Sequence, residues 1–307
     1  GVALGVGRRA RPAVTAAPAQ GAAPKDWTPS AHEVERRAVR RRLRRRGTLI
    51  AGAATVVGLG LLVAVIVLSP GWQRVQETFL SPYHARQALP SIAEGFLLNV
   101  AMFMVAEPLI LLLGTLVAVV RGTTSPWLTP LRLLAVAYVD LFRGLPTLLV
   151  VFLFAFGIPA LQLQGVTTSL FWLATAALVL CYGAYVAEVI RSGIDSIHPS
   201  QVASARSLAL SQSQVMRFVV LPQAGRRVVP PLMNDFVSLQ KDTALVASVG
   251  VFEALFAAQD YGNYNFNYTP LLVAGLFFVA LTIPLARLTD WLGRRVAVGE
   301  VVLDIEA

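Results

Sequence analysis

Six polar side chains that could do chemistry lie within one long apolar stretch, residues 228–250. Asn234, Ser238 and Lys241 recur at i, i+4 and i+7, and Asp235 and Asp242 follow the same period, so both series share one helical face. A charged group at the centre of a bilayer costs at least about 2.5–3.5 kcal/mol, so it normally faces a cavity or a partner. We therefore expect these residues, with the adjacent Thr243, to line a substrate path. The alternative is a structural Lys241–Asp242 pair that only orients the end of the helix.

Glu107 is a seventh candidate for this path, in another apolar stretch. It precedes Pro108, which is expected to kink a helix at that point. Either the carboxylate faces the same route, or the apolar stretch ends before residue 107 and water solvates the group. The sequence leaves both interpretations open.

Enzyme chemistry has no support in the sequence. The chain has two lysines, and neither stands in the GxxxxGK[ST] pattern of a phosphate-binding loop. The three histidines (His32, His84 and His198) lack metal-ligand spacing, and neither GxSxG nor HExxH occurs. We expect no enzyme activity, metal or cofactor in this chain, so any ATPase that drives it must be a separate subunit.

Composition predicts the elements that must position these groups. The chain of 307 residues is 56% hydrophobic, and its mean hydropathy of +0.64 is too high for an ordinary soluble protein. A helix needs about 20 apolar residues to cross a membrane. Six stretches approach that length: Leu49–Leu68, Gly95–Val120, Thr147–Leu161, Ser169–Ile190, Val228–Gly250 and Leu271–Leu288. The sequence therefore predicts an all-α integral membrane protein with about six transmembrane helices.

The distribution of positive charge predicts the orientation. Twelve of the 26 Lys and Arg residues precede Gly47, and eleven more fall on the same side of the predicted membrane. Only Arg74 and Arg86 fall on the other side, and Lys241 lies within a predicted span, so the positive-inside rule places both termini in the cytoplasm. The net charge of +9 gathers in a juxtamembrane arm, which favours anionic lipid, at about 1 kcal/mol per basic residue, over nucleic acid.

The segment Ser200–Pro222 is polar, is expected to be helical, and lies between two apolar stretches. Ser211 and Gln214 form the pattern of a capping box, so a second short helix is expected to begin there. The apolar residues of that helix, spaced as one packing face, are Val215, Phe218 and Val219. Two short helices on the cytoplasmic side of the membrane indicate a docking knob for another protein.

This stretch resembles the coupling loop of the permease subunits of ABC importers. The pattern of that family is Glu-Ala-Ala, three residues, Gly, nine residues, then Ile-x-Leu-Pro. The matching residues here are Ala203-Ser204-Ala205, Ala209 and Val219-Val220-Leu221-Pro222. Four further blocks are similar in the same order: YVDLFRGLP, GAYVAEVIRSGIDSI, LPQAGRRVVPPLMNDF and LQKDTALVASVGVFEAL. Together they resemble the polar amino acid branch of the family (histidine, glutamine and glutamate type) over about residues 93–295.

The resemblance implies a domain plan. Composition predicts a largely disordered basic tail (1–47), with a short basic helix over Ala31–Arg46 as the alternative for its last part. An additional transmembrane helix with an extracytoplasmic segment (48–92) would then precede a five-helix core of the type I importer kind (93–295). The coupling loop would occupy residues 196–222, and a short cytoplasmic tail (296–307) would follow. The residues expected to contact the ATPase through this loop are Ser200, Gln201, Ala203, Ser204, Ala205, Arg206, Ala209, Ser211, Arg217 and Pro222.

The resemblance also implies a function: alternating access in the cytoplasmic membrane, carrying a polar amino acid such as glutamate, glutamine, arginine or histidine. The implied partners are two ATPase subunits that bind ATP and Mg, a second permease subunit and an extracytoplasmic binding protein. The ammonium of the substrate would meet Asp235 or Asp242, and its carboxylate would meet Lys241. The alternatives are a permease for an opine or a sulfur-containing amino acid, and a membrane scaffold that recruits an ATPase without transport.

Two residues depart from the family pattern. Ala203 replaces the usual Glu, which removes a possible partner of Arg206. Ala209 replaces the usual Gly, and an alanine is strained there if the position needs a positive φ. We expect the loop to remain functional, with an altered surface.

Overall fold

The computed structural model describes residues 30–123 and 125–305, and for residues 294–305 it describes the backbone alone. Every regular element within these residues is a helix, which confirms the predicted all-α class. The chain divides into two compact units, residues 1–70 and 71–307.

From residue 30 onward, the first unit consists mainly of the helix α1 (Ala31–Val67), which runs unbroken from the arginine run into the first apolar stretch. The side chain of Ser30 caps its start by accepting a hydrogen bond of 3.3 Å from the N–H of Glu33. The expected boundary at residue 47 therefore falls inside a helix, and residues 31–47 are helical, as in the alternative of a basic helix over Ala31–Arg46. The rest of the expected tail, residues 1–29, lies outside the described residues.

The second unit begins with a short helix, α2 (Trp72–Phe79), and a long one, α3 (Pro82–Gly122). The next elements are η1 (Pro126–Leu128), α4 (Thr129–Gly144), α5 (Thr147–Phe152), the π-helical η2 (Leu153–Gly157), α6 (Ile158–Ala160) and α7 (Leu170–Asp195). The remaining elements are α8 (Pro199–Ser207), α9 (Gln212–Val215), the π-helical η3 (Met216–Val220), α10 (Leu221–Asp242), the 3-10 helix η4 (Thr243–Val249), α11 (Ala254–Asn265) and α12 (Thr269–Ile305). The expected C-terminal tail is thus helical as far as Ile305.

Four of the six predicted spans lie within single long helices: α1, α3, α7 and α12. The other two do not. The predicted span Thr147–Leu161 consists of α5, η2 and α6, which meet α4 at a bend of 105°. The predicted span Val228–Gly250 runs out of α10 into η4, and the stretch from α9 to η4 meets α11 at a bend of 44°. The total of six holds only if each bent pair counts as one span.

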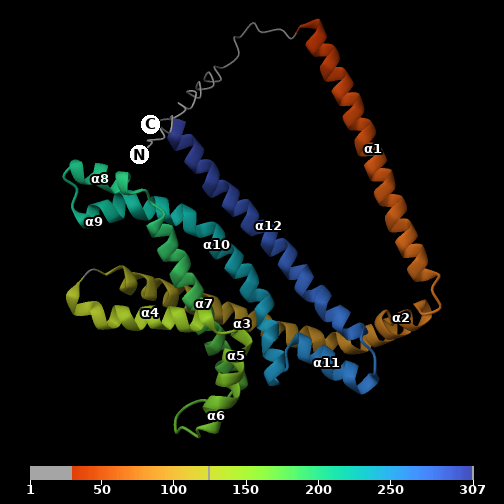
Figure 1. Ribbon diagram of the computed structural model, residues 1–307. Coiled ribbons are helices and arrows are strands. Elements are labelled where there is room, and N and C mark those ends of the chain that lie inside the picture. Colours follow the sequence, from red (N-terminus) through yellow and green to blue (C-terminus); the bar gives the residue numbers. More distant parts are fainter. Residues whose placement is uncertain (1–29, 124, 306–307) are drawn as a thin grey trace, which may run out of the picture. The chain divides into compact units, whose positions relative to one another are not determined.

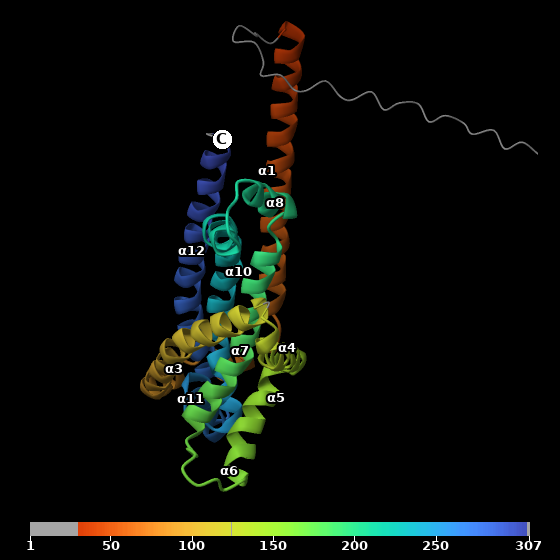
Figure 2. The same cartoon turned by 90° about the vertical axis from the view of Figure 1, so that its left-hand side faces the viewer.

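Helix α7 forms the centre of the second unit and packs against α3, α4, α5 and α10 (Figures 1 and 2). Small residues let the helices approach closely: a methyl group added at Gly114 of α3 would lie 2.4 Å from Cγ1 of Val186 on α7. The main core joins Met102 and Ile110 of α3, Leu178 of α7 and Leu239 of α10. A second core, rich in alanine, joins α3, α11 and α12.

Candidate functional site

The predicted knob consists of two short helices between α7 and α10 (Figure 2). His198 caps α8, with Nδ1 accepting a hydrogen bond of 3.2 Å from the N–H of Ser200. The capping box of α9 is confirmed: the N–H of Gln214 donates to Oγ of Ser211 at 3.4 Å, and the N–H of Ser211 donates to Oε1 of Gln214 at 2.8 Å. These local bonds fix where each helix starts.

The knob has a small apolar core of its own. It contains Ile197 from the end of α7, Ala205 from α8, Val215 and Val220 from α9 and η3, and Ala224 from α10. The core therefore includes residues from both ends of the loop as well as from its helices. This packing makes the knob a compact body rather than a flexible loop.

The predicted packing face of Val215, Phe218 and Val219 holds only in part, because Val215 and Val219 pack in this core and Phe218 does not. The π-helical turn Met216–Val220 changes the period, so Val215 and Val220, five residues apart, lie on the buried side. Phe218 is 62% exposed instead, and Leu208 at the end of α8 is 78% exposed. The sequence reasoning missed Leu208, although a leucine in a polar loop is itself a signal.

Ala205 also differs from expectation, because it is buried in the core of the knob and offers no surface to a partner. The other predicted loop residues are exposed: Ser200, Gln201, Ala203, Ser204, Arg206, Ala209, Ser211, Arg217 and Pro222. The guanidinium of Arg217 lies over the ring of Phe218, 5.7 Å from its centroid. The exposed surface of the knob is therefore apolar at Leu208 and Phe218 and positive at Arg217.

The two departures from the family pattern have visible consequences. Arg206, which lacks a glutamate at position 203, donates a hydrogen bond of 2.5 Å to Oε1 of Gln212 and so joins α8 to α9. Ala209 has a φ of +59°, a left-handed conformation that costs an alanine roughly 1–2 kcal/mol. The position does require a positive φ, so the usual glycine would be unstrained there.

A hydrogen-bonded clamp lies at the base of the knob. Nη1 of Arg227, on α10, donates to the backbone oxygen of Ser196 at 2.6 Å and to its Oγ at 3.0 Å. Ser196 is the C-terminal cap of α7. The two helices are in close contact here, since a methyl group added at Gly193 would lie 2.1 Å from Cγ2 of Val228.

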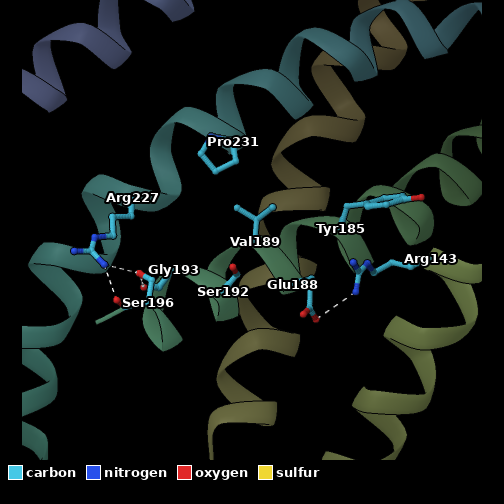
Figure 3. Close-up of a pocket in the computed structure, with 9 residues that line it drawn as sticks. All are labelled: Arg143, Tyr185, Glu188, Val189, Ser192, Gly193, Ser196, Arg227 and Pro231. Atoms are coloured by element: carbon cyan, nitrogen blue, oxygen red, sulfur yellow. Dashed lines mark hydrogen bonds and ion pairs between the residues drawn. The ribbon is translucent and has the colours of Figure 1, made fainter. Parts of the chain in front are cut away.

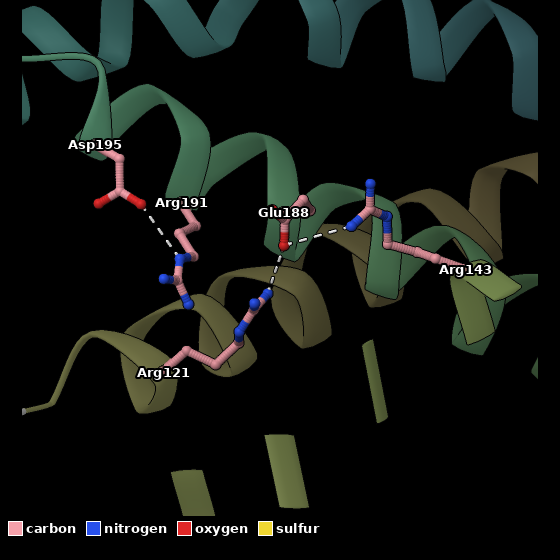
Figure 4. A network of polar contacts seen from close by, with 5 residues as sticks. All are labelled: Arg121, Arg143, Glu188, Arg191 and Asp195. Atoms are coloured by element: carbon pink, nitrogen blue, oxygen red, sulfur yellow. Dashed lines mark hydrogen bonds and ion pairs between the residues drawn. The ribbon is translucent and has the colours of Figure 1, made fainter. Parts of the chain in front are cut away.

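Glu188 joins three helices through ion pairs (Figure 4). Its carboxylate oxygen lies 2.7 Å from Nη1 of Arg121, at the end of α3, and 3.6 Å from Nη1 of Arg143, at the end of α4. The Arg121 side chain is 7% exposed and that of Glu188 is 32% exposed, so this pair is partly shielded from water. Arg191 and Asp195 form a separate, exposed pair at 3.3 Å along the same helix.

A groove of about 350 Å³ separates the Arg227–Ser196 clamp from the Glu188–Arg143 ion pair (Figure 3). Arg227 and Ser196 lie at one end, Arg143 and Tyr185 lie with Glu188 at the other, and Val189 and Ser192 line the wall between them. The groove therefore has charged groups at both ends and lies between α4, α7 and α10, beside the base of the knob.

The predicted pathway residues do not all face the same way. Asn234 is exposed and lines a different groove, of about 360 Å³, with Thr289 and Asp290 of α12. Lys241 is exposed, and no ion pair involves it among the described residues. Asp242 instead accepts a hydrogen bond of 2.7 Å from the hydroxyl of Tyr182 on α7. The structure does not bring Lys241 and Asp242 together as a pair.

Two other acids do come together. Glu107, partly buried on α3, is close enough to Asp235 on α10 for their charges to interact. Oδ2 of Asp235 is buried and has no hydrogen-bond partner among the described residues. Ser238 is partly buried on the next turn of α10. Asp235 and Asp242 of α10 both lie near Tyr182 of α7, and no cation is bonded to Glu107, Asp235 or Asp242 in the described part of the chain.

Thr243 belongs to a buried polar network that the sequence reasoning missed. Its Oγ1 accepts a hydrogen bond of 3.2 Å from Nδ2 of Asn99 on α3, and Oδ1 of Asn99 accepts one of 3.2 Å from the N–H of Ala254. The carboxylate of Glu253, which is 1% exposed, accepts from the first N–H groups of α11. These hydrogen bonds fix the chain between η4 and α11 in place. The carboxylate of Glu253 occupies the N-terminus of α11.

Comparisons with known proteins agree on one family. The family model described as "Binding-protein-dependent transport system inner membrane component" matches residues 110–298. The arginine transport system permease protein ArtQ of Bacillus subtilis is 32% identical over 196 residues, which are 64% of this chain and 87% of that protein. The probable glutamine ABC transporter permease protein GlnM of the same organism is 34% identical over 205 residues, which are 66% and 91% of the two chains.

Solved structures match over the same region. A crystal structure of an amino acid ABC transporter with histidines aligns with a TM-score of 0.62 and 27% identity, covering 68% of this chain and 95% of that chain. The methionine ABC transporter MetNI in an inward-facing conformation aligns with a TM-score of 0.54 and 19% identity, covering 68% and 97%. The second of these matches concerns the fold alone.

Proposed function

Because the chain belongs to the family of inner membrane components of binding-protein-dependent transport systems, we propose that it is the permease subunit of an ATP-driven importer of a polar amino acid. The observation that carries this proposal is the knob of α8, α9 and η3. It is a compact body joined to α7 and to α10, and α10 bears five of the seven residues of the candidate path. A push on the knob would therefore move the helices that line the route.

The energy comes from elsewhere in the assembly. This chain has no phosphate-binding loop, so two separate ATPase subunits bind ATP and Mg and contact the knob. Leu208 and Phe218 are the apolar anchors of this interface, and Arg217 supplies its positive charge. A second permease copy or relative completes the path, and an extracytoplasmic binding protein delivers the substrate.

The charges of the candidate path favour a substrate with a positively charged group. Glu107 and Asp235 lie near each other without a cation, and an ammonium or guanidinium group would relieve that repulsion. The N-terminus of α11 does not bind the carboxylate of the substrate, because Glu253 already fills it. Lys241, which is exposed on α10, remains the candidate for that role. A polar amino acid of the arginine, histidine or glutamine kind fits this arrangement.

Cross-linking tests the knob as the ATPase contact. The chain has a single cysteine, Cys181, which is buried in α7, so Cys181→Ala gives a background for single-cysteine variants. Phe218→Cys and Leu208→Cys should cross-link to the ATPase subunit in membranes, and the cross-link should weaken or strengthen when ATP is added. Leu163→Cys, exposed in the loop before α7, is the matched control and should not cross-link.

Functional variants separate the transporter from a scaffold that only recruits an ATPase. Phe218→Ala should lower the amount of ATPase that co-purifies and lower uptake in parallel, because one apolar anchor is lost. A scaffold would lose the ATPase without any effect on amino acid uptake. Full uptake and a normal amount of ATPase in the double variant Leu208→Ala with Phe218→Ala would show that the knob is not the contact.

A further inference from the structure

We infer that Arg227 is a positioning residue for energy coupling: it clamps the base of the knob, so that a push from the ATPase moves α7 and α10 as one body. This inference rests on the proposed function. It gives a role in coupling, distinct from docking to the ATPase, to a residue that follows the expected coupling loop (196–222).

The geometry of the clamp is specific. Nη1 of Arg227 contacts two oxygens of one residue, the backbone oxygen of Ser196 at 2.6 Å and its Oγ at 3.0 Å. The Ser196 hydroxyl in turn donates to the backbone oxygen of Gly193 at 2.6 Å, so its lone pairs face the guanidinium. The last carbonyl groups of a helix lack partners within the helix and form the negative end of its dipole. Arg227 therefore caps α7 from the neighbouring helix with a charge-assisted bond.

The clamp closes a loop of thirty residues at its narrowest point. Gly193 and Val228 pack so closely beside it that no side chain fits between α7 and α10. On the knob side of the clamp, Ile197 follows Ser196 directly and Ala224 lies three residues before Arg227, and both pack in the core of the knob. The apolar contacts lie on both sides of the polar one, which resists sliding of one helix along the other.

The position of the clamp also decides which helices receive the movement. α7 carries Glu188, which pairs with Arg121 of α3 and Arg143 of α4 (Figures 3 and 4). A knob clamped to both α7 and α10 can move all four helices as one body, whereas without the clamp the knob could shift against the end of α7 and pass on less of the movement. The loss of Arg227 should therefore uncouple transport from ATP hydrolysis rather than prevent docking.

The test measures the coupling ratio, meaning the amino acid imported per ATP hydrolysed, with the complete transporter in proteoliposomes. Arg227→Gln removes the charge, and the ratio should fall about tenfold, the order expected for one lost charge-assisted hydrogen bond. ATP hydrolysis and co-purification of the ATPase should stay close to wild type. Arg227→Lys keeps a charged donor and should restore part of the ratio.

Arg226→Gln is the matched control, because Arg226 is the preceding residue of α10 and has no hydrogen bond or ion pair among the described residues. It should couple normally. Ser196→Ala removes only the Oγ contact and should lower the ratio to a value between wild type and Arg227→Gln. If Arg227→Gln fails to assemble, the coupling ratio of Ser196→Ala tests the clamp on its own.

The outcomes separate this inference from the proposed function. If the wild-type complex shows no ATP-driven uptake, the proposed function fails. If the wild type transports and Arg227→Gln or Ser196→Ala has a normal coupling ratio, the clamp has no role in coupling. A parallel fall of uptake and ATP hydrolysis in Arg227→Gln would also overturn the inference, because it indicates loss of folded protein instead of uncoupling.

Discussion

The hydroxyl of Tyr182 on α7 donates a hydrogen bond of 2.7 Å to Oδ2 of Asp242 at the end of α10. Tyr182 is 7% exposed, so the bond is largely shielded from water. It gives Asp242 a partner on another helix and leaves Lys241, its neighbour in sequence, exposed. The link between α7 and α10 is thus made at both ends of α10, by Tyr182 here and by Ser196 at the knob.

Removing this hydroxyl should destabilise the protein. Tyr182→Phe should lower the free energy of unfolding by about 1.5–3 kcal/mol, the range for a hydrogen bond to a charged group. Thermal unfolding of the purified protein measures the change. Tyr185→Phe is the matched control, since the hydroxyl of Tyr185 has no hydrogen bond among the described residues, and Lys241→Met should also be near neutral. If Lys241→Met loses as much stability as Tyr182→Phe, the result would contradict the structure and support a Lys241–Asp242 ion pair.

The left-handed backbone of Ala209 predicts a stabilising substitution. Ala209→Gly should raise stability by about 0.5–1 kcal/mol, because the relief of strain exceeds the added entropy of the unfolded chain. The same change at the exposed Ala203, inside α8, should lower stability by roughly 0.5–1 kcal/mol. Opposite signs in the two melting temperatures support the assigned φ. Destabilisation by Ala209→Gly would contradict it.

Gly95 marks the closest approach of α3 to the break before α11. A methyl group there would lie 2.5 Å from the backbone carbon of Glu253, which cannot move aside as a side chain would. Gly95→Ala should therefore destabilise the protein by about 1–3 kcal/mol or more, as overpacking does. Gly275→Ala in α12, where nothing lies within 4 Å, should be neutral or stabilising in the same melting experiment. Equal behaviour of the two variants would show that α3 does not approach the break this closely.

The orientation in the membrane can be read from labelling. In the Cys181→Ala background, a membrane-impermeant maleimide should label Leu163→Cys in intact cells, because the α6–α7 loop is expected outside. Gln201→Cys in α8 should be labelled only after the cells are opened, because the positive-inside rule places the knob in the cytoplasm. The reverse pattern would invert the assigned topology.

Sequence reasoning succeeded where the causes were local. The capping box of Ser211 and Gln214 depends on residues three apart, and long apolar runs identify α1, α3, α7 and α12. It failed at Phe218, because a π-helical turn changes the helical period without any clear sequence signal. Hydropathy located the third predicted span, which is helical from Thr147 to Ala160, but it does not register the bend of 105° between α4 and α5.

The polar contacts of the site could not be read from the sequence, because they join residues far apart in it. Asn99 and Thr243 are 144 residues apart, and Arg227 and Ser196 are 31 apart. A helical period places Asp235, Lys241 and Asp242 near one another on α10 but does not reveal which of them a neighbouring helix already engages. The partners of Asp242 and Thr243 depend on how α3 and α7 pack.

The most direct test is uptake by the reconstituted transporter. The chain would be assembled in proteoliposomes with its ATPase and its binding protein, and labelled arginine, histidine and glutamine would be offered in turn. Accumulation of at least one of them should require ATP, should stop with an ATPase variant that binds ATP without hydrolysing it, and should fall in Asp235→Asn. ATP hydrolysis by an intact complex without accumulation of any amino acid, or accumulation that does not need ATP, would contradict the account.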